Sequence, residues 1–218
     1  MSLSDFDLFV FDMDGVLTSD SSSWNYVHRR FSVDNHDLRQ KFEAGEITYE
    51  DFLKGDVGLW IEKRGRVSKG EVISILREIP MTRGMTQTIN TLKSQGKRVA
   101  IVSGGISWMA DIVQSNVKFD DVNCNHICTD RDGFLIPEGI IEVDFKRKDL
   151  NIRSLQNKYS IPVERTVCVG DSLDDRSMFR EAGFSIAFNP RHEELSGYAD
   201  TVVRSADLME VVNAVCRS

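Results

Sequence analysis

The 218-residue sequence contains no apolar run long enough to cross a membrane, which argues against a membrane-spanning helix. It also lacks a basic excess, because 27 lysines and arginines stand against 34 aspartates and glutamates, a formal net charge of −7. That balance argues against nucleic acid or an anionic membrane as the main partner. No basic segment followed by an apolar stretch opens the chain, so we expect no signal peptide.

Cysteine is scarce, and no two cysteines form a Cys-x-x-Cys pair. The segment that contains Cys124 and Cys128 is read as a β-hairpin that turns at Asp132-Gly133. Scattered cysteines of this kind indicate free thiols and a cytoplasmic location rather than a disulfide framework. The four cysteines are Cys124, Cys128, Cys168 and Cys216.

Two aspartates follow the apolar run at residues 8–11, which reads as a fully buried parallel strand. Asp12 stands at its carboxyl end, where open α/β sheets place their ligands, and Gly15 permits a sharp turn. Asp12 and Asp14 can offer oxygen ligands to Mg²⁺, and a carboxylate can also act as a nucleophile. Taken alone, the motif is equally compatible with an ordinary acidic turn.

Two further apolar runs also end in polar residues. Residues 99–102 lead into Ser103-Gly104-Gly105, and residues 166–169 lead into a segment with several aspartates, beginning at Asp171. Because parallel strands bring their carboxyl ends to one edge of a sheet, we expect these groups to lie together.

In this order and spacing, the motifs resemble those of the haloacid-dehalogenase (HAD) superfamily of aspartate-nucleophile phosphatases, and in particular its phosphoserine phosphatase branch. The resemblance covers essentially the whole chain. It implies an α/β fold with a Rossmann-like parallel sheet and a small inserted helical cap. It also implies Mg²⁺ as cofactor and a small phosphorylated metabolite as substrate, and we expect a monomer or homodimer.

The apolar pattern locates the insert. Residues from about 22 to 79 contain no convincing strand, and their apolar side chains recur every three or four positions, as in amphipathic helices. We therefore predict a helical cap over residues 19–80 and a catalytic core made of residues 1–18 and 81–218.

The resemblance also implies roles for the acidic residues. Asp12 would attack phosphorus, and Asp14 would protonate the leaving alcohol and then activate water. Asp12, the backbone carbonyl of Asp14, and Asp171 would hold the metal. Asp175 would support the site, either by holding a metal-bound water or by orienting a lysine.

The phosphoryl group would be bound by the hydroxyl of Ser103 and the amide of Gly104. A lysine is needed because several carboxylates share one pocket. Family spacing favours Lys148 over Lys146 for this role.

The substrate-reading residues of the branch are missing. Ser21 aligns with a glutamate that reads the substrate amine, and Asp56 aligns with an arginine that reads the substrate carboxylate. Asp20, Lys54 or Arg64 could compensate. Asp174 also replaces the usual asparagine, and its role stays open. The candidate specificity residues are Asp20, Ser21, Tyr49, Asp56 and Gly105.

Three functions therefore compete. The first is a Mg²⁺-dependent phosphomonoesterase, and its nearest variant is a phosphoserine phosphatase with relocated recognition groups. The second is a receiver-like signalling module that also phosphorylates an aspartate at a strand end. The third is a catalytically idle binding protein with the same fold.

Overall fold

The structure is a computed structural model that describes residues 2–217. Its centre is a seven-stranded sheet in the order β4-β3-β2-β1-β5-β6-β7. All neighbouring strands are parallel except β3 and β4, which form an antiparallel hairpin. This arrangement confirms the predicted α/β fold. The strands are β1 (Leu8–Phe11), β2 (Arg98–Ile106), β3 (Asp121–Thr129), β4 (Leu135–Ile140), β5 (Thr166–Gly170), β6 (Phe184–Phe188) and β7 (Thr201–Val203).

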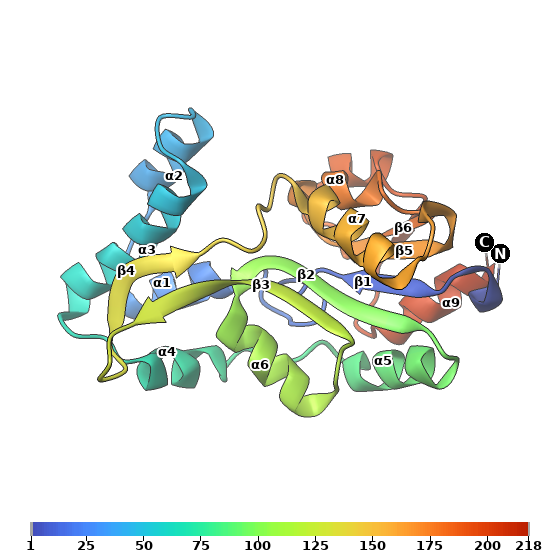
Figure 1. Ribbon diagram of the computed structural model, residues 1–218, viewed down its shortest axis with the longest axis horizontal. Helices are drawn as coiled ribbons and strands as arrows, with labels where there is room; N and C mark the ends of the chain where they lie inside the picture. Colours follow the sequence, from blue (N-terminus) through green and yellow to red (C-terminus); the bar gives the residue numbers. More distant parts are fainter. Residues whose placement is uncertain (1, 218) are drawn as a thin grey trace.

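Helices cover both faces of the sheet (Figure 1). The alternation of side chains along β1 explains why, since Phe9 and Phe11 join one apolar cluster while Leu8 and Val10 join another. Every residue of β1 is buried, as expected for a central parallel strand. The first cluster is covered by α5 (Met85–Ser94), α6 (Ser107–Asn116) and α9 (Met209–Arg217), and the second by α7 (Lys148–Tyr159) and α8 (Arg176–Phe179).

Between β1 and α5 the chain forms four α-helices, in agreement with the expected helical pattern. We call residues 19–80 the helical insert. Its second half packs on the hairpin, where a Cβ at Gly139 of β4 would collide with Leu53. The insert lies at the end of the sheet formed by the β3–β4 hairpin, and the two chain termini lie at the opposite end (Figure 1). Its helices are α1 (Ser23–Phe31), α2 (His36–Glu43), α3 (Tyr49–Arg64) and α4 (Lys69–Leu76).

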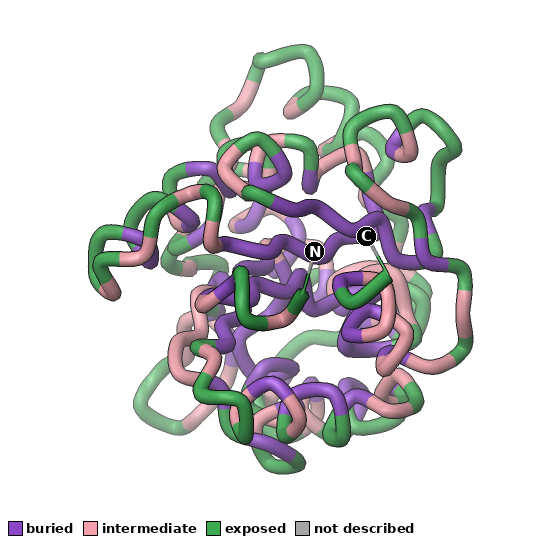
Figure 2. The backbone as a smooth tube through the Cα atoms, turned by 90° about the vertical axis from the view of Figure 1, so that its right-hand side faces the viewer, coloured by how far each residue is buried: buried purple, intermediate pink, exposed green. Residues whose placement is uncertain are grey.

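Burial is concentrated in the sheet and in the inner sides of the helices (Figure 2). The four cysteines are free, as expected, and two of them, Cys124 and Cys168, are buried. No helix in the described part of the chain is both long and apolar enough to cross a membrane.

Candidate active site

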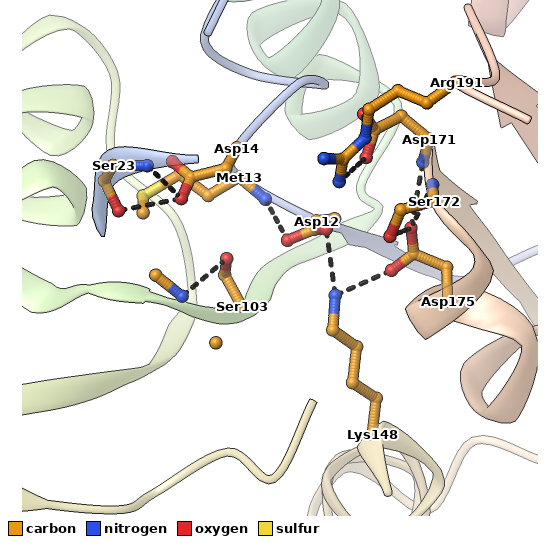
Figure 3. Close-up of polar contacts among 12 residues, drawn as sticks. Asp12, Met13, Asp14, Ser23, Ser103, Lys148, Asp171, Ser172, Asp175 and Arg191 are labelled. Carbon is orange, nitrogen blue, oxygen red and sulfur yellow. Dashed lines mark hydrogen bonds and ion pairs between the residues drawn. The ribbon is translucent and has the colours of Figure 1, made fainter. Parts of the chain in front are cut away.

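The carboxyl ends of β1, β2 and β5 meet at one edge of the sheet. Phe11 of β1 pairs with Ile101 of β2 and with Val169 of β5, so the polar residues at the carboxyl ends of these strands come together. Strand β2 runs on to Ile106, beyond the expected end at residue 102, so Ser103 lies inside the strand rather than after it. Figure 3 shows Asp12, Ser103 and Asp171 converging from three strands on one centre. The structure therefore brings these groups together at one edge of the sheet, as expected from the sequence.

Lys148 lies between two carboxylates of this centre. Its Nζ is 2.9 Å from Asp12 Oδ2 and 2.6 Å from Asp175 Oδ1, and only 2% of the residue is exposed. Burial by itself would lower the pKa of Lys148, but Asp12 and Asp175 outweigh that effect and raise it, so the ammonium stays charged. Lys146, the competing candidate, instead places its Nζ over the Phe42 ring, 4.3 Å from the centroid.

Asp12 is the carboxylate best placed to react. Its Oδ1 accepts a hydrogen bond from the Met13 N–H at 2.7 Å, and its Oδ2 faces Lys148. Burial, the largest effect, raises the pKa of Asp12 to about 7, although Lys148 acts in the opposite direction. A carboxylate with a raised pKa is a stronger nucleophile than an exposed one when it is ionised.

Asp175 is fully engaged by the protein. Its Oδ2 accepts hydrogen bonds from the backbone N–H groups of Asp171 and Ser172, each at 2.9 Å, and its Oδ1 accepts one from Lys148. A Cβ at Gly170 would collide with this side chain, so glycine is required there. Of the two expected roles for Asp175, these contacts fit the orientation of the lysine.

Asp14 has one bound and one free oxygen. Its Oδ2 accepts hydrogen bonds from the Ser23 N–H and Oγ–H, each at 2.7 Å. Its Oδ1 is buried and makes no hydrogen bond to any residue in the described range. Burial raises the pKa of Asp14, which favours the protonated form that a general acid needs. Gly105 permits this arrangement, because a Cβ there would lie 2.7 Å from Asp14 Oδ2.

Asp171 completes an acidic cluster. One oxygen each from Asp12, Asp171 and Asp175 lies within 4.8 Å of the others. Burial, helped by Asp175, raises the pKa of Asp171 to about 8, although Arg191, whose Nε is 2.8 Å from Asp171 Oδ2, opposes the shift. Gly15, at φ +81°, leaves room for Asp171, since a Cβ there would collide with the carboxylate.

The phosphate-binding candidates lie at the end of β2. Ser103 is 2% exposed, and its Oγ accepts a hydrogen bond from the Gly105 N–H at 3.2 Å. The carbonyl of Gly104 accepts hydrogen bonds from Trp24 Nε1 at 3.0 Å and from Asn125 Nδ2 at 3.2 Å. Trp24 belongs to the helical insert, so the insert holds this end of β2 in place.

A cavity of about 140 Å³ opens above these groups, between the sheet edge and the helical insert. Asp12, Asp14 and Lys148 form its core side. The insert contributes the candidate specificity residues Ser21, Tyr49 and Asp56, and Gly105 lies on the core side.

Three suggested recognition groups do not reach this cavity. Asp20 is paired with Arg29, whose Nη2 lies 2.5 Å from Asp20 Oδ2, and it does not line the cavity. Lys54 pairs with Glu50, and Arg64 pairs with Glu71, both away from the cavity lining. The expectation that one of them replaces the missing recognition groups is therefore not supported by the geometry.

Comparison with known proteins decides the family. Residues 6–183, most of the chain, match the family of haloacid dehalogenase-like hydrolases. The chain belongs to this family.

Several relatives of this HAD-like hydrolase are phosphoserine phosphatases. It is 28% identical over 218 residues to one from Idiomarina loihiensis, covering 97% of this chain and 94% of that protein. It is 29% identical over 216 residues to one from Archaeoglobus fulgidus, covering 95% of this chain but 59% of the longer relative. A solved phospho-aspartyl intermediate analogue of phosphoserine phosphatase superposes with a TM-score of 0.80 and 26% identity, covering 97% of this chain and 99% of that one. The predicted resemblance to HAD phosphatases of the phosphoserine phosphatase-like branch is confirmed.

Sequence reasoning missed two cationic residues of this HAD-like hydrolase that line the cavity, Arg39 and Arg191. Arg191 had a readable signal, because it follows β6, a strand whose carboxyl end lies at the catalytic edge. Arg39 had none, since it is one of several charged residues on α2. Asp174 also lines the cavity, and burial raises the pKa of its carboxyl.

Proposed function

We propose that this protein is a Mg²⁺-dependent phosphomonoester hydrolase that acts on a small phosphorylated metabolite through an aspartyl-phosphate intermediate. The observation that carries the proposal is the pair of adjacent carboxyls, one against a buried lysine and one with a free buried oxygen. Asp12 supplies the first and Asp14 the second. The cytoplasmic location and the monomeric or homodimeric state expected from the sequence stay predictions.

The reaction has two halves. An Asp12 oxygen attacks phosphorus and the bond to the ester oxygen breaks, while Asp14 donates its proton to the departing alcohol. Asp14, now ionised, then takes a proton from a water molecule, which attacks the aspartyl-phosphate and releases inorganic phosphate. The free Oδ1 of Asp14 is the atom available for both transfers.

Charge on the phosphoryl oxygens would be met by groups of the sheet edge. Ser103 and the Gly104 amide would bind two of these oxygens, and Lys148 would neutralise the charge shared with Asp12. Such preorganised donors contribute most of the rate in phosphoryl transfer, because little covalent chemistry is required of the protein.

The residues present fit a magnesium ion. Asp12, Asp171 and the backbone carbonyl of Asp14 are hard oxygen donors, the type that Mg²⁺ prefers, and the missing Cβ of Gly15 leaves space beside Asp171. When bound, the ion would neutralise negative charge on the phosphoryl group. The two carboxylates would otherwise repel a phosphate dianion.

The second candidate is a true phosphoserine phosphatase, which the similarity to proteins of that name favours. Against it stand Ser21 and Asp56, which line the cavity and which the sequence alignment matches to the glutamate and the arginine of the branch. A receiver-like module and an idle binding protein are less well supported, because every catalytic position holds a competent side chain.

The test is phosphate release from a panel of phosphate monoesters, with p-nitrophenyl phosphate as a generic substrate. We expect activity with Mg²⁺, none in excess chelator, and recovery when Mg²⁺ is restored. Asp12→Asn should be inactive, whereas Asp14→Asn should accumulate a phosphorylated protein detectable by mass spectrometry. A phosphoryl group that persists for hours on the wild-type protein would instead support the receiver-like module.

A further inference from the structure

We propose that Asp56 selects the substrate, and that the preferred substrate is the phosphate ester of an amino alcohol, with an ammonium group and no carboxylate on its leaving group. This inference rests on the proposed phosphomonoesterase activity and assigns the class of its substrate.

Asp56 is a buried acid in the wall of the catalytic cavity. It belongs to α3 of the helical insert, is 3% exposed, and lines the same cavity as Asp12 and Asp14. It is therefore not a solvated surface residue. A carboxylate with so little contact with water needs partners to stabilise it.

One oxygen of Asp56 has neighbours in the protein. Oδ1 accepts a hydrogen bond from Asn35 Nδ2 at 2.9 Å, and His28 Nε2 lies 3.3 Å away. The Trp60 indole N–H, which can only donate, gives its hydrogen bond to His28 Nδ1 at 2.8 Å. His28 Nδ1 is therefore the acceptor in this hydrogen bond, and Nε2, which faces Asp56, makes no hydrogen bond to any described residue.

The other oxygen, Oδ2, has neither a hydrogen-bond donor nor a cationic side chain as a partner within the described residues. Among residues 2–217 it accepts no hydrogen bond, and neither a lysine nor an arginine forms an ion pair with Asp56. Arg39, which lines the same cavity, instead has its Nε 3.5 Å from Glu43. Although Arg39, Lys148 and Arg191 also line the cavity, no lysine or arginine among the described residues forms an ion pair with Asp56.

An ammonium group on the substrate would supply a counter-charge and hydrogen-bond to Oδ2. Trp24, Tyr49 and Phe52 also line the cavity, and aromatic faces attract a cation. A carboxylate would be disfavoured, because it would meet the like charge of Asp56 in a poorly solvated site.

The experiment compares kcat/KM of the Mg²⁺-loaded enzyme for phosphoethanolamine, glycerol phosphate and phosphoserine. We expect phosphoethanolamine to be the best of the three. In Asp56→Asn, which keeps the shape and the Oδ1 acceptor, the ratio of phosphoethanolamine to glycerol phosphate should fall by about ten- to a hundredfold, as expected for the loss of a charge-assisted hydrogen bond. Glu62→Gln, an exposed acid on the same helix, is the matched control and should leave the ratio unchanged.

Two outcomes overturn the inference: phosphoserine as the best substrate of the wild type, or an unchanged ratio in Asp56→Asn. Activity on p-nitrophenyl phosphate separates these results from a failure of the phosphatase proposal itself. If no ester is hydrolysed, calorimetric binding of phosphoethanolamine against glycerol phosphate still tests the selection, and equal affinities would refute it.

Discussion

At the scale of single residues, one buried ammonium sets the electrostatics of the site. Lys148, Asp12 and Asp175 are exposed by 2%, 5% and 0%, so their charges act with little screening by water. Two buried carboxylates that lie close together favour sharing a proton, unless a cation lies between them. Lys148 therefore helps to keep Asp12 ionised, and an ionised Asp12 is what attack on phosphorus requires.

We expect Lys148→Met to lower kcat/KM by about a hundredfold or more, the size typical for removing one preorganised charge-stabilising group. The acid limb of the pH profile should also move to higher pH, because Lys148 lowers the pKa of Asp12. Steady-state kinetics across pH checks both. Lys146→Met is the matched control, since Lys146 lies over Phe42 instead. Equal losses in the two variants would contradict the assignment.

At the scale of elements, the turn after β1 places two carboxylates by bending sharply. Gly15 adopts φ +81°, a left-handed conformation that costs other residues free energy. The same turn passes so close to Asp171, at the end of β5, that a Cβ would collide with its carboxylate. The turn after one strand and the acid after another are therefore packed as one unit.

Gly15→Ala should lower the free energy of unfolding by about 1–3 kcal/mol and weaken Mg²⁺ binding, because it adds backbone strain and displaces Asp171. Urea denaturation and a Mg²⁺ titration measure the two effects. Gly133→Ala is a close control, as Gly133 has φ +82° but open space around its Cβ position. It should show the strain alone. A Gly15→Ala variant with unaltered Mg²⁺ affinity would refute the role of this packing.

At the scale of the whole molecule, an acidic chain with a net charge of −7 encloses part of its negative charge at its active site. Asp12, Asp14, Asp171 and Asp175 are all buried there, with Lys148 and Arg191 as the cations in contact with them within the described residues. This surplus favours protonation of the carboxyls when no metal is bound.

Without metal, the protein should lose stability as pH rises. The pKa of Asp12 is raised to about 7 and that of Asp171 to about 8, from 3.8. Each folded carboxyl holds its proton more tightly than the unfolded chain does, so its stabilising contribution is complete below the unfolded pKa and is lost as pH rises through the folded one.

We therefore expect Tm in chelator to fall between about pH 5 and about pH 8, and added Mg²⁺ to reverse the fall by binding the ionised form. Thermal unfolding across this range measures it. Asp171→Asn, which cannot ionise, should show a shallower fall. A Tm in chelator that rises over the same pH range would contradict the raised pKa values of Asp12 and Asp171.

How far the sequence predicts the site can be judged from individual residues. Asp12, Ser103 and Asp171 were predicted to lie together because each follows an apolar run, and the carboxyl ends of parallel strands share one edge. Lys148 needed the family spacing as well, since nothing local distinguishes it from Lys146. Ser23 was missed although it holds Asp14 with two hydrogen bonds, because a serine at a helix start has many ordinary roles.

The sequence by itself determined the parallel strands, the helical character of the segment between β1 and α5, and the acidic ends of β1 and β5, because hydrophobic periodicity and chain order are local properties. Only the tertiary structure decided what surrounds the cavity. It buries Asp56 beside His28 and Asn35, and it pairs Asp20 with Arg29 outside the cavity. These outcomes depend on how α1, α2 and α3 pack over the sheet edge, and burial and charge pairing between distant segments leave no trace in local spacing.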